Sequence, residues 1–339
     1  DVYKRQELRF GPRKEKRAAD VSPNTPLPLL QKAMRTLRRR IGAMQSYLQQ
    51  REPWLRFDAV SDPRGARGRR WPLPGLLATA VMSLALLARS LRRAEQLSEE
   101  LCECRRLRRL GVRRRVPDST LGDALSEVAP AELLAELHRQ VRAEHRRKAL
   151  RPVRLPVGVV AIDGKCQAVL NEPANPFTCQ RQGGRDGPER YLHRVLNATL
   201  VSSAACVCIH QQSIGAHTNE MGSFRDFFAS LEAAYRRTDL FEVVTTDAGV
   251  LCEADCRWLD EQGYGYVLAL KDNNPLLELE ARGLLQSLAE HERPAARDQD
   301  WQCDSSRGWV RRELYVSSEL AGWPGWEHLH QVWLVRVWA

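Results

Sequence analysis

Two short apolar runs that each end in an aspartate constrain this chain more than any other feature. They span residues 157–165 (VGVVAIDGK) and 241–249 (FEVVTTDAG). β-Branched residues bounded by proline or glycine predict buried strands, so Asp163 and Asp247 lie where a strand leaves the core. For either aspartate alone, capping of a turn by its own side chain is the favoured interpretation. Two such strand ends in one chain suggest one shared site.

Composition divides the 339 residues, of which 43% are hydrophobic, into three parts. Residues 1–30 are charged and then proline-rich, which predicts a mobile arm. Residues 31–150 read as a small helical domain rich in arginine. After Pro152 and Pro156 the pattern changes to strands, and we expect residues 151–339 to form a second domain.

The charge of the chain points to a polyanionic partner. Lys and Arg number 52 against 42 Asp and Glu, a formal net charge of +10, and clustered arginine suits phosphate contacts. We therefore expect DNA binding, although an acidic protein partner or a solvated face stays open. The glycine- and arginine-rich loop 62–70 is equally consistent with a phosphate contact and with a flexible connector. The candidate DNA-binding arginines are Arg105, Arg106, Arg108, Arg109, Arg113, Arg114 and Arg115.

Neither a membrane span nor a metal–thiolate site is favoured. Residues 71–88 are apolar, but prolines interrupt them early and arginines flank both ends, which indicates a buried core helix. The nine cysteines never show a CxxC spacing. Reduced thiols in a cytoplasmic protein are favoured over a zinc site.

The C-terminal part predicts three strands, a helix, a strand, a helix and a strand, ending near Leu270. That order resembles the ribonuclease-H-like α/β fold, in which the first strand lies at the centre of a mixed sheet beside the fourth. Asp163 and Asp247 would then be neighbours. Adjacent carboxylates repel unless cations lie between them, and carboxylates suit Mg²⁺ or Mn²⁺.

Four motifs follow one another in the second domain: AIDGK at 161–165, HTNE at 217–220, TTDA at 245–248 and ALKDN at 269–273. In order and spacing they resemble the DDE class of bacterial insertion-sequence transposases, and most closely the branch that includes the H-repeat-associated proteins. Segments of the first domain also resemble the helical domain of that branch, including DPR at 62–64, GRR at 68–70 and PDST at 117–120. The resemblance covers about residues 50–339.

The resemblance implies a Mg²⁺- or Mn²⁺-dependent enzyme that cuts DNA at transposon ends and joins the freed 3′-hydroxyl to target DNA. It implies that Asp163 and Asp247 are catalytic and bind the metal, and that paired DNA ends are held by a homodimer. Other motif positions would contact phosphate or support the carboxylates: Lys165, Asn219, Glu220, Lys271 and Asn273. Of these, Lys165 and Lys271 are the candidate DNA contacts.

The third carboxylate of this class has no clear counterpart. It belongs to a helix after a β insertion, and residues 301–317 and 329–338 read as strands of that insertion. We therefore expect the chain to end before that helix and the copy to cut DNA poorly. Glu313 is a tempting substitute, but an exposed strand glutamate paired with a neighbouring arginine is the favoured interpretation.

Three functions stay open from the sequence. The first is a DDE transposase that lacks its third carboxylate. The second is a non-catalytic DNA-binding protein derived from one. The third, a ribonuclease-H-like nuclease for RNA or repair substrates, gives no reason for the N-terminal domain.

Overall fold

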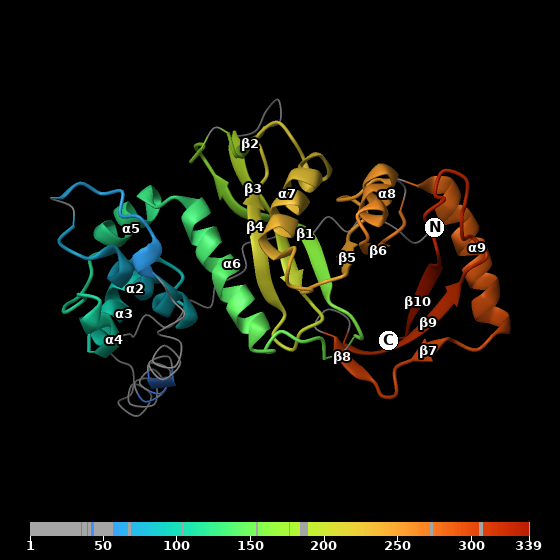
Figure 1. Cartoon of the computed structure of the whole chain (residues 1–339), viewed down its shortest axis with the longest axis horizontal. Helices are drawn as coiled ribbons and strands as arrows, with labels where there is room; N and C mark the ends of the chain where they lie inside the picture. The colour runs from blue at the N-terminus through green and yellow to red at the C-terminus, as the bar shows by residue number, and fades with distance from the viewer. Residues whose placement is uncertain are drawn as a thin grey trace. The chain divides into compact units, whose positions relative to one another are not determined.

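The computed structural model describes residues 57–66, 69–103, 105–153, 155–175, 177–183, 189–271, 274–304 and 308–338, with positions 35, 39, 42 and 43 in helical conformation. The expected arm at 1–30 lies outside these residues. The chain forms two compact units, divided between Leu133 and Leu134. The division falls earlier than the break at residue 150 expected from composition. Figure 1 labels the helices and strands of both units.

The first unit is helical, with η1 (Phe57–Ala59), α2 (Leu73–Ala85), α3 (Leu91–Leu101), α4 (Arg105–Arg109) and α5 (Asp118–Glu127). Its core is built around α2, whose Leu76 and Met82 are fully buried. Gly75 lets α2 approach the segment after α4 closely, because a Cβ there would lie 2.6 Å from Val112 Cγ2. The interpretation of 71–88 as a buried core helix is confirmed. Among the described helices, none has the length and apolar character needed to cross a membrane.

The segment after α2 forms two separate helices, α3 and α4. Ser90 caps α3, since its hydroxyl accepts a hydrogen bond from the Arg93 amide at 3.1 Å. The two are separated because Leu101 and Leu107 are both fully buried in the same core. A break between them lets both side chains reach it.

Helix α6 (Pro130–Arg146) begins in the first unit and lies mostly in the second. Val141 of α6 and Leu150 pack into the core of the second unit. The Arg142 guanidinium donates a hydrogen bond to the Ala234 carbonyl at 2.8 Å. These contacts explain why residues 134–150 belong to the second unit.

The second unit has an open mixed sheet of six strands, β1 (Val159–Leu170), β2 (Cys179–Gln182), β3 (Arg190–Leu200), β4 (Val207–Ser213), β5 (Val243–Thr246) and β6 (Gly265–Leu268). The order is β2-β3-β1-β5-β6, and β4 also pairs with β3. Strands β1, β5 and β6 are parallel, while β3 is antiparallel to β1 and β4. The expectation that the first strand lies beside the strand that leads to Asp247 is confirmed.

Helices α7 (Glu220–Tyr235) and α8 (Glu253–Glu261) cover one face of this sheet. Val160 and Ile162 of β1 contribute to the core on that face, together with a row of α7 phenylalanines. Residues two apart in a strand share a face, so Asp163 lies on the opposite face. β1 itself continues to Leu170, well beyond the expected strand end at Asp163.

A second sheet of four strands follows helix α9 (Pro275–His291). Its strands are β7 (Ala296–Arg297), β8 (Gln302–Asp304), β9 (Gly308–Ser317) and β10 (Val332–Trp338). Ala281 and Leu285 of α9 pack on Tyr315 and Val332 of this sheet. The strands expected at 301–317 and 329–338 are present, whereas α9 has no counterpart in the sequence-based expectations.

Candidate functional site

The two candidate catalytic aspartates occupy equivalent positions on neighbouring parallel strands. In the ladder between β1 and β5 the last pair is Ile162 with Thr246, and Asp163 and Asp247 are the next residues on each side. Both aspartates are exposed. Neighbouring strands lie about 4.8 Å apart. The sheet therefore places the two predicted carboxylates side by side, directly after the last residue pair of the β1–β5 ladder.

Lys271 joins this site through Asp247. Its Nζ lies 2.7 Å from Asp247 Oδ1, and both side chains are more than half exposed. The hydrogen bond from Lys271 holds the pKa of Asp247 below its ordinary value, and the backbone amides of Ala248 and Gly249 add to this shift. Lys165, the other candidate phosphate contact, is exposed two residues beyond Asp163 and so on the same face of β1. Asn273 lies outside the residues that the structure describes.

Two amide side chains continue the row of Asp163 across the sheet. Asp163 pairs with Asn197 of β3, and Asn197 pairs with Gln211 of β4. The Gln211 Nε2 donates to Asn197 Oδ1 at 2.8 Å. Sequence reasoning missed both residues. A signal was present, because Asn197 is a polar residue between the apolar residues Leu196 and Ala198.

Asn219 and Glu220 of the HTNE motif lie on the helix-covered face of the sheet, opposite the face that carries Asp163. Asn219 caps α7 by accepting a hydrogen bond from the Gly222 amide at 2.8 Å. Glu220 forms an ion pair with Arg194 of β3. Its carboxylate also lies against Gly164, where an added Cβ would come within 2.0 Å of Glu220 Oε1. Because Gly164 faces the covered side of the sheet, Glu220 lies across the sheet from Asp163.

The donor set of the site suits a hard divalent cation. Asp163 and Asp247 provide carboxylate oxygens on adjacent strands, and Asn197 provides an amide oxygen one strand away. Mg²⁺ and Mn²⁺ prefer such oxygen ligands. Lys271 holds one oxygen of Asp247, so an ion there would compete with an ammonium group. Among the described residues, three or more acidic, His or Cys side chains nowhere gather closely enough to hold a metal ion.

Glu313 is not part of this site. It lies on β9 of the four-stranded sheet, is only 7% exposed, and pairs with Arg297 of β7. Trp338 Nε1 donates to it at 3.0 Å and the Tyr315 hydroxyl at 3.3 Å. The expectation of a pairing with a neighbouring arginine is confirmed, but the expectation of an exposed side chain is wrong. Three donors contact the Glu313 carboxylate and so offset the cost of burying its charge.

The arginine cluster at 105–115 projects from a well-anchored segment. Leu107, Val112 and Val116 have no exposed surface, and the arginines between them face outward. The described exposed members are Arg105, Arg108, Arg109, Arg113, Arg114 and Arg115, whereas the side chain of Arg106 lies outside the described residues.

Some cluster members already contact neighbouring groups. Arg115 pairs with Glu95 at 2.8 Å, Arg108 lies 3.9 Å from Glu103, and Arg114 lies 5.1 Å from the ring centre of Trp71. Exposed ion pairs of this kind are weak, so a phosphate can displace them.

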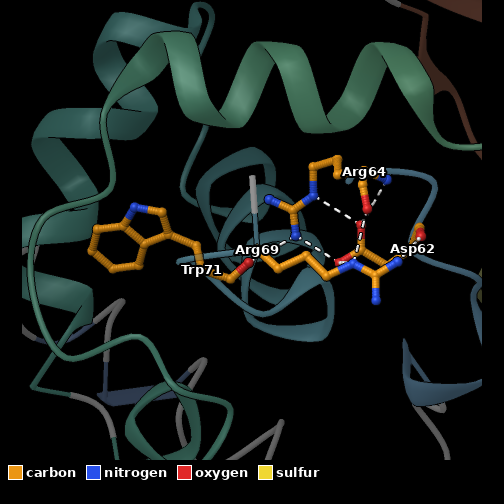
Figure 2. A network of polar contacts seen from close by, with 4 residues as sticks. All are labelled: Asp62, Arg64, Arg69 and Trp71. Atoms are coloured by element: carbon orange, nitrogen blue, oxygen red, sulfur yellow. Dashed lines mark hydrogen bonds and ion pairs between the residues drawn. The ribbon is translucent and has the colours of Figure 1, made fainter. Parts of the chain in front are cut away.

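The loop at 62–70 has an internal structure (Figure 2). The Arg64 guanidinium donates two hydrogen bonds to the Asp62 carboxylate, from Nε at 2.9 Å and from Nη2 at 2.8 Å. Arg64 Nη2 also donates to the Trp71 carbonyl at 2.7 Å. Arg69 Nε donates to the Arg64 carbonyl at 2.9 Å. With Arg64 only 7% exposed, its guanidinium holds the loop together and is not available to phosphate.

The cysteines and the comparisons with known proteins add no further assignment. None of the cysteines in the described part of the chain forms a disulfide. No protein-family model matches the chain. No curated protein shows significant similarity to it.

Proposed function

We propose that this chain is a DNA-processing protein of the DDE transposase type. The observation that carries the proposal is the alignment of Asp163 and Asp247 at the same level on two adjacent parallel strands. Two carboxylates in that arrangement are suited to hold a divalent cation against a phosphodiester. Neither aspartate contributes to a buried core, so packing does not explain why two acidic side chains lie at this position.

The sheet order supports a ribonuclease-H-like fold for the second unit. The successive strands β1, β3 and β4 are antiparallel neighbours, and β5 and β6 then extend the sheet on the other side of β1 in parallel. The first strand is thus internal, as the proposed fold requires. In this proposal, the four-stranded sheet with β9 and β10 would be the β insertion.

The exposed arginines between 105 and 115 support DNA as the partner. Six guanidinium groups on a segment anchored by three buried side chains present a dense positive surface. Such a surface binds phosphate without reading base sequence. A cytoplasmic location and a homodimer on paired DNA ends belong to the same proposal.

Asp163 and Asp247 would hold Mg²⁺ or Mn²⁺. The bound ion supplies activation of a water or 3′-hydroxyl and stabilisation of the leaving oxygen. The chain's own residues would then have separate roles. Lys271 fixes the Asp247 carboxylate and keeps it ionised, Lys165 is placed to meet a phosphate, and Asn197 borders Asp163 on the next strand.

A second function, DNA binding without cleavage, is favoured because the other candidate acids, Glu220 and Glu313, form ion pairs away from the site. Glu220 pairs with Arg194 on the face of the sheet opposite Asp163, and Glu313 pairs with Arg297 in the four-stranded sheet. Within the described residues, the site therefore holds two carboxylates. Two carboxylates at the site are what we expect of a chain that binds DNA through its arginines and cuts it slowly or not at all.

The test is divalent-metal-dependent nicking of DNA that carries the sequences flanking the gene. The chain is compared with an Asp163→Asn, Asp247→Asn double variant and with Asp226→Asn, an exposed aspartate of α7, as the matched control. Nicking that is lost only in the double variant supports the enzyme. DNA binding without nicking in every variant supports the second function. Nicking that survives in the double variant contradicts the proposed site.

A further inference from the structure

Asn197 is the residue directly opposite Asp163 on the neighbouring strand β3. The two form a register pair of the antiparallel β1–β3 ladder, and Cβ atoms in such pairs lie about 4.5 to 5.5 Å apart. Leu196 and Ala198, on either side of Asn197, are buried in the core on the helix-covered face of the sheet. Asn197 therefore shares the opposite face with Asp163, and its amide adjoins the Asp163 carboxylate.

Gln211 of β4 determines which way the Asn197 amide is turned. The two residues form the next register pair across the sheet, and Gln211 Nε2 donates to Asn197 Oδ1 at 2.8 Å. The oxygen and the nitrogen lie on opposite sides of the planar amide group. Because Oδ1 is turned toward β4, Nδ2 is turned toward β1 and Asp163. The group that Asn197 presents beside Asp163 is therefore a hydrogen-bond donor.

A donor at this position suits a phosphate oxygen rather than a metal ion. Mg²⁺ and Mn²⁺ take oxygen ligands, and the oxygen of Asn197 already accepts the bond from Gln211. Hydrogen bonds to a charged acceptor are about twice as strong as those between neutral groups. Lys165 lies two residues after Asp163 on the same face of β1. Asp163 thus has one donor beside it across the sheet and another further along its own strand.

Packing does not require an amide at position 197. Val195, two residues earlier on the same face of β3, is only 2% exposed, so this face of the strand accommodates an apolar side chain. Val195 pairs with Lys165, and Thr199 pairs with Ala161. Of these three successive levels of β3, the one with the amide is the one that carries the candidate catalytic aspartate.

We propose that Asn197 contacts the substrate, donating a hydrogen bond from Nδ2 to a non-bridging oxygen of the phosphodiester bound at Asp163 and Asp247. Gln211 is a positioning residue, since it acts through the orientation of the Asn197 amide. This inference rests on the proposed function of the site. It adds the group that recognises the oxyanion of the substrate, whereas the carboxylates hold the ion.

The inference is tested by the affinity of the full chain for DNA that carries the sequences flanking the gene. Fluorescence anisotropy measures the affinity in Ca²⁺, which takes carboxylate oxygens, and in EDTA. The ratio of the two affinities reports binding that depends on an ion, because the arginine cluster contributes in both solutions. Asn197→Leu removes the amide at similar size. It should lower this ratio about tenfold and leave the affinity in EDTA unchanged.

Charged substitutions separate a phosphate donor from an ion ligand. Asn197→Asp replaces the donor by a carboxylate and should lower the ratio further than Asn197→Leu, because a carboxylate repels phosphate. A rise of the ratio in Asn197→Asp would mean that the residue contacts the ion, which contradicts the proposal.

A second pair of variants tests the positioning role of Gln211. Gln211→Glu cannot donate to Oδ1, so Nδ2 of Asn197 turns toward β4 instead. The ratio should fall about as far as in Asn197→Leu. Gln212→Glu is the matched control, because it adds the same charge on the helix-covered face of β4, opposite Leu196, and should leave the ratio unchanged.

The outcomes distinguish this inference from the proposed function. An ion-dependent ratio that is lost in the Asp163→Asn, Asp247→Asn double variant but unchanged in Asn197→Leu and Gln211→Glu overturns the inference and leaves the proposed function intact. Equal affinities of the unaltered chain in Ca²⁺ and EDTA overturn both. If Asn197→Leu does not fold, the comparison of Gln211→Glu with Gln212→Glu decides the matter.

Discussion

At the scale of single residues, the glycine beside Asp163 is required by its neighbour on α7. A Cβ at Gly164 would lie 2.0 Å from Glu220 Oε1, and Glu220 is held by Arg194. The carboxylate cannot move away without losing that ion pair. The residue after Asp163 therefore sets how closely α7 approaches β1, which links the AIDGK and HTNE motifs through packing.

We predict that Gly164→Ala lowers the free energy of unfolding by about 2 kcal/mol, as expected for overpacking at a well-packed position. Gly283→Ala in α9 is the control, because a Cβ there meets no atom within 4 Å and should raise stability by up to about 1 kcal/mol. Urea unfolding of both variants provides the measurement. An equal effect of the two substitutions would show that Gly164 is not constrained by Glu220.

At the scale of elements, α6 is joined to β4 by a pair of histidines, His138 and His210, of which His210 is fully buried. His138 Nε2 lies 2.8 Å from His210 Nδ1, and the two rings stack with centroids 5.0 Å apart. Burial lowers the pKa of each histidine to about 4. Arg142 lowers the pKa of His138 further, and His138 lowers that of His210 further. Tyr235 of α7 packs its ring edge against His138.

This pair predicts a loss of stability in mild acid. The unfolded histidines take up protons below their ordinary pKa of 6.5, while the folded ones stay neutral until about pH 4. Stability should therefore fall as the pH decreases from 6.5 to 4, by on the order of 3 kcal/mol for each histidine. Unfolding of the second unit measured across this range should have a flatter pH dependence in His138→Leu, His210→Phe. If stability in the His138→Leu, His210→Phe variant depends on pH as steeply as in the exposed-site control His291→Gln, the histidine pair is not the cause of the acid sensitivity.

The arginine cluster makes a second prediction at this scale. Replacing Arg105, Arg108 and Arg113 by glutamine should weaken DNA binding and reduce the slope of log K against log salt by up to about 3, because each lost phosphate contact removes about 0.9. The control removes three exposed arginines of the second unit, Arg190, Arg237 and Arg293, and so changes the net charge equally. Fluorescence anisotropy at several salt concentrations gives both slopes. Equal slopes would assign the effect to net charge alone.

At the scale of the whole molecule, the two units have separate cores. The first contains Leu76 and Met82, and the second contains Phe224 and Phe228, with no residue in common. We predict two transitions in differential scanning calorimetry. Phe228→Ala should lower one of them, since such a substitution costs about 3 to 5 kcal/mol. Leu76→Ala should lower the other, and a joint shift of both transitions by either variant would show that the units unfold together.

The elements that follow from local pattern were predictable. β-Branched runs predicted β1 and β5, and the apolar spacing of residues 220–236 predicted α7, because periodicity is set by neighbours along the chain. The same is true of α2, whose composition required burial. Helix α9 was missed, and its exposed Leu276 and Leu279 blur the apolar stripe that would reveal it.

The amino-acid sequence by itself determined the local elements, the positive charge and the two aspartates that end the apolar runs. Only the tertiary structure decided their partners. It aligned Asp163 with Asp247, tied Glu220 to Arg194, and buried Glu313 in a separate sheet. The physical reason is that strand register and ion pairing depend on residues far apart in the chain, which no local pattern encodes.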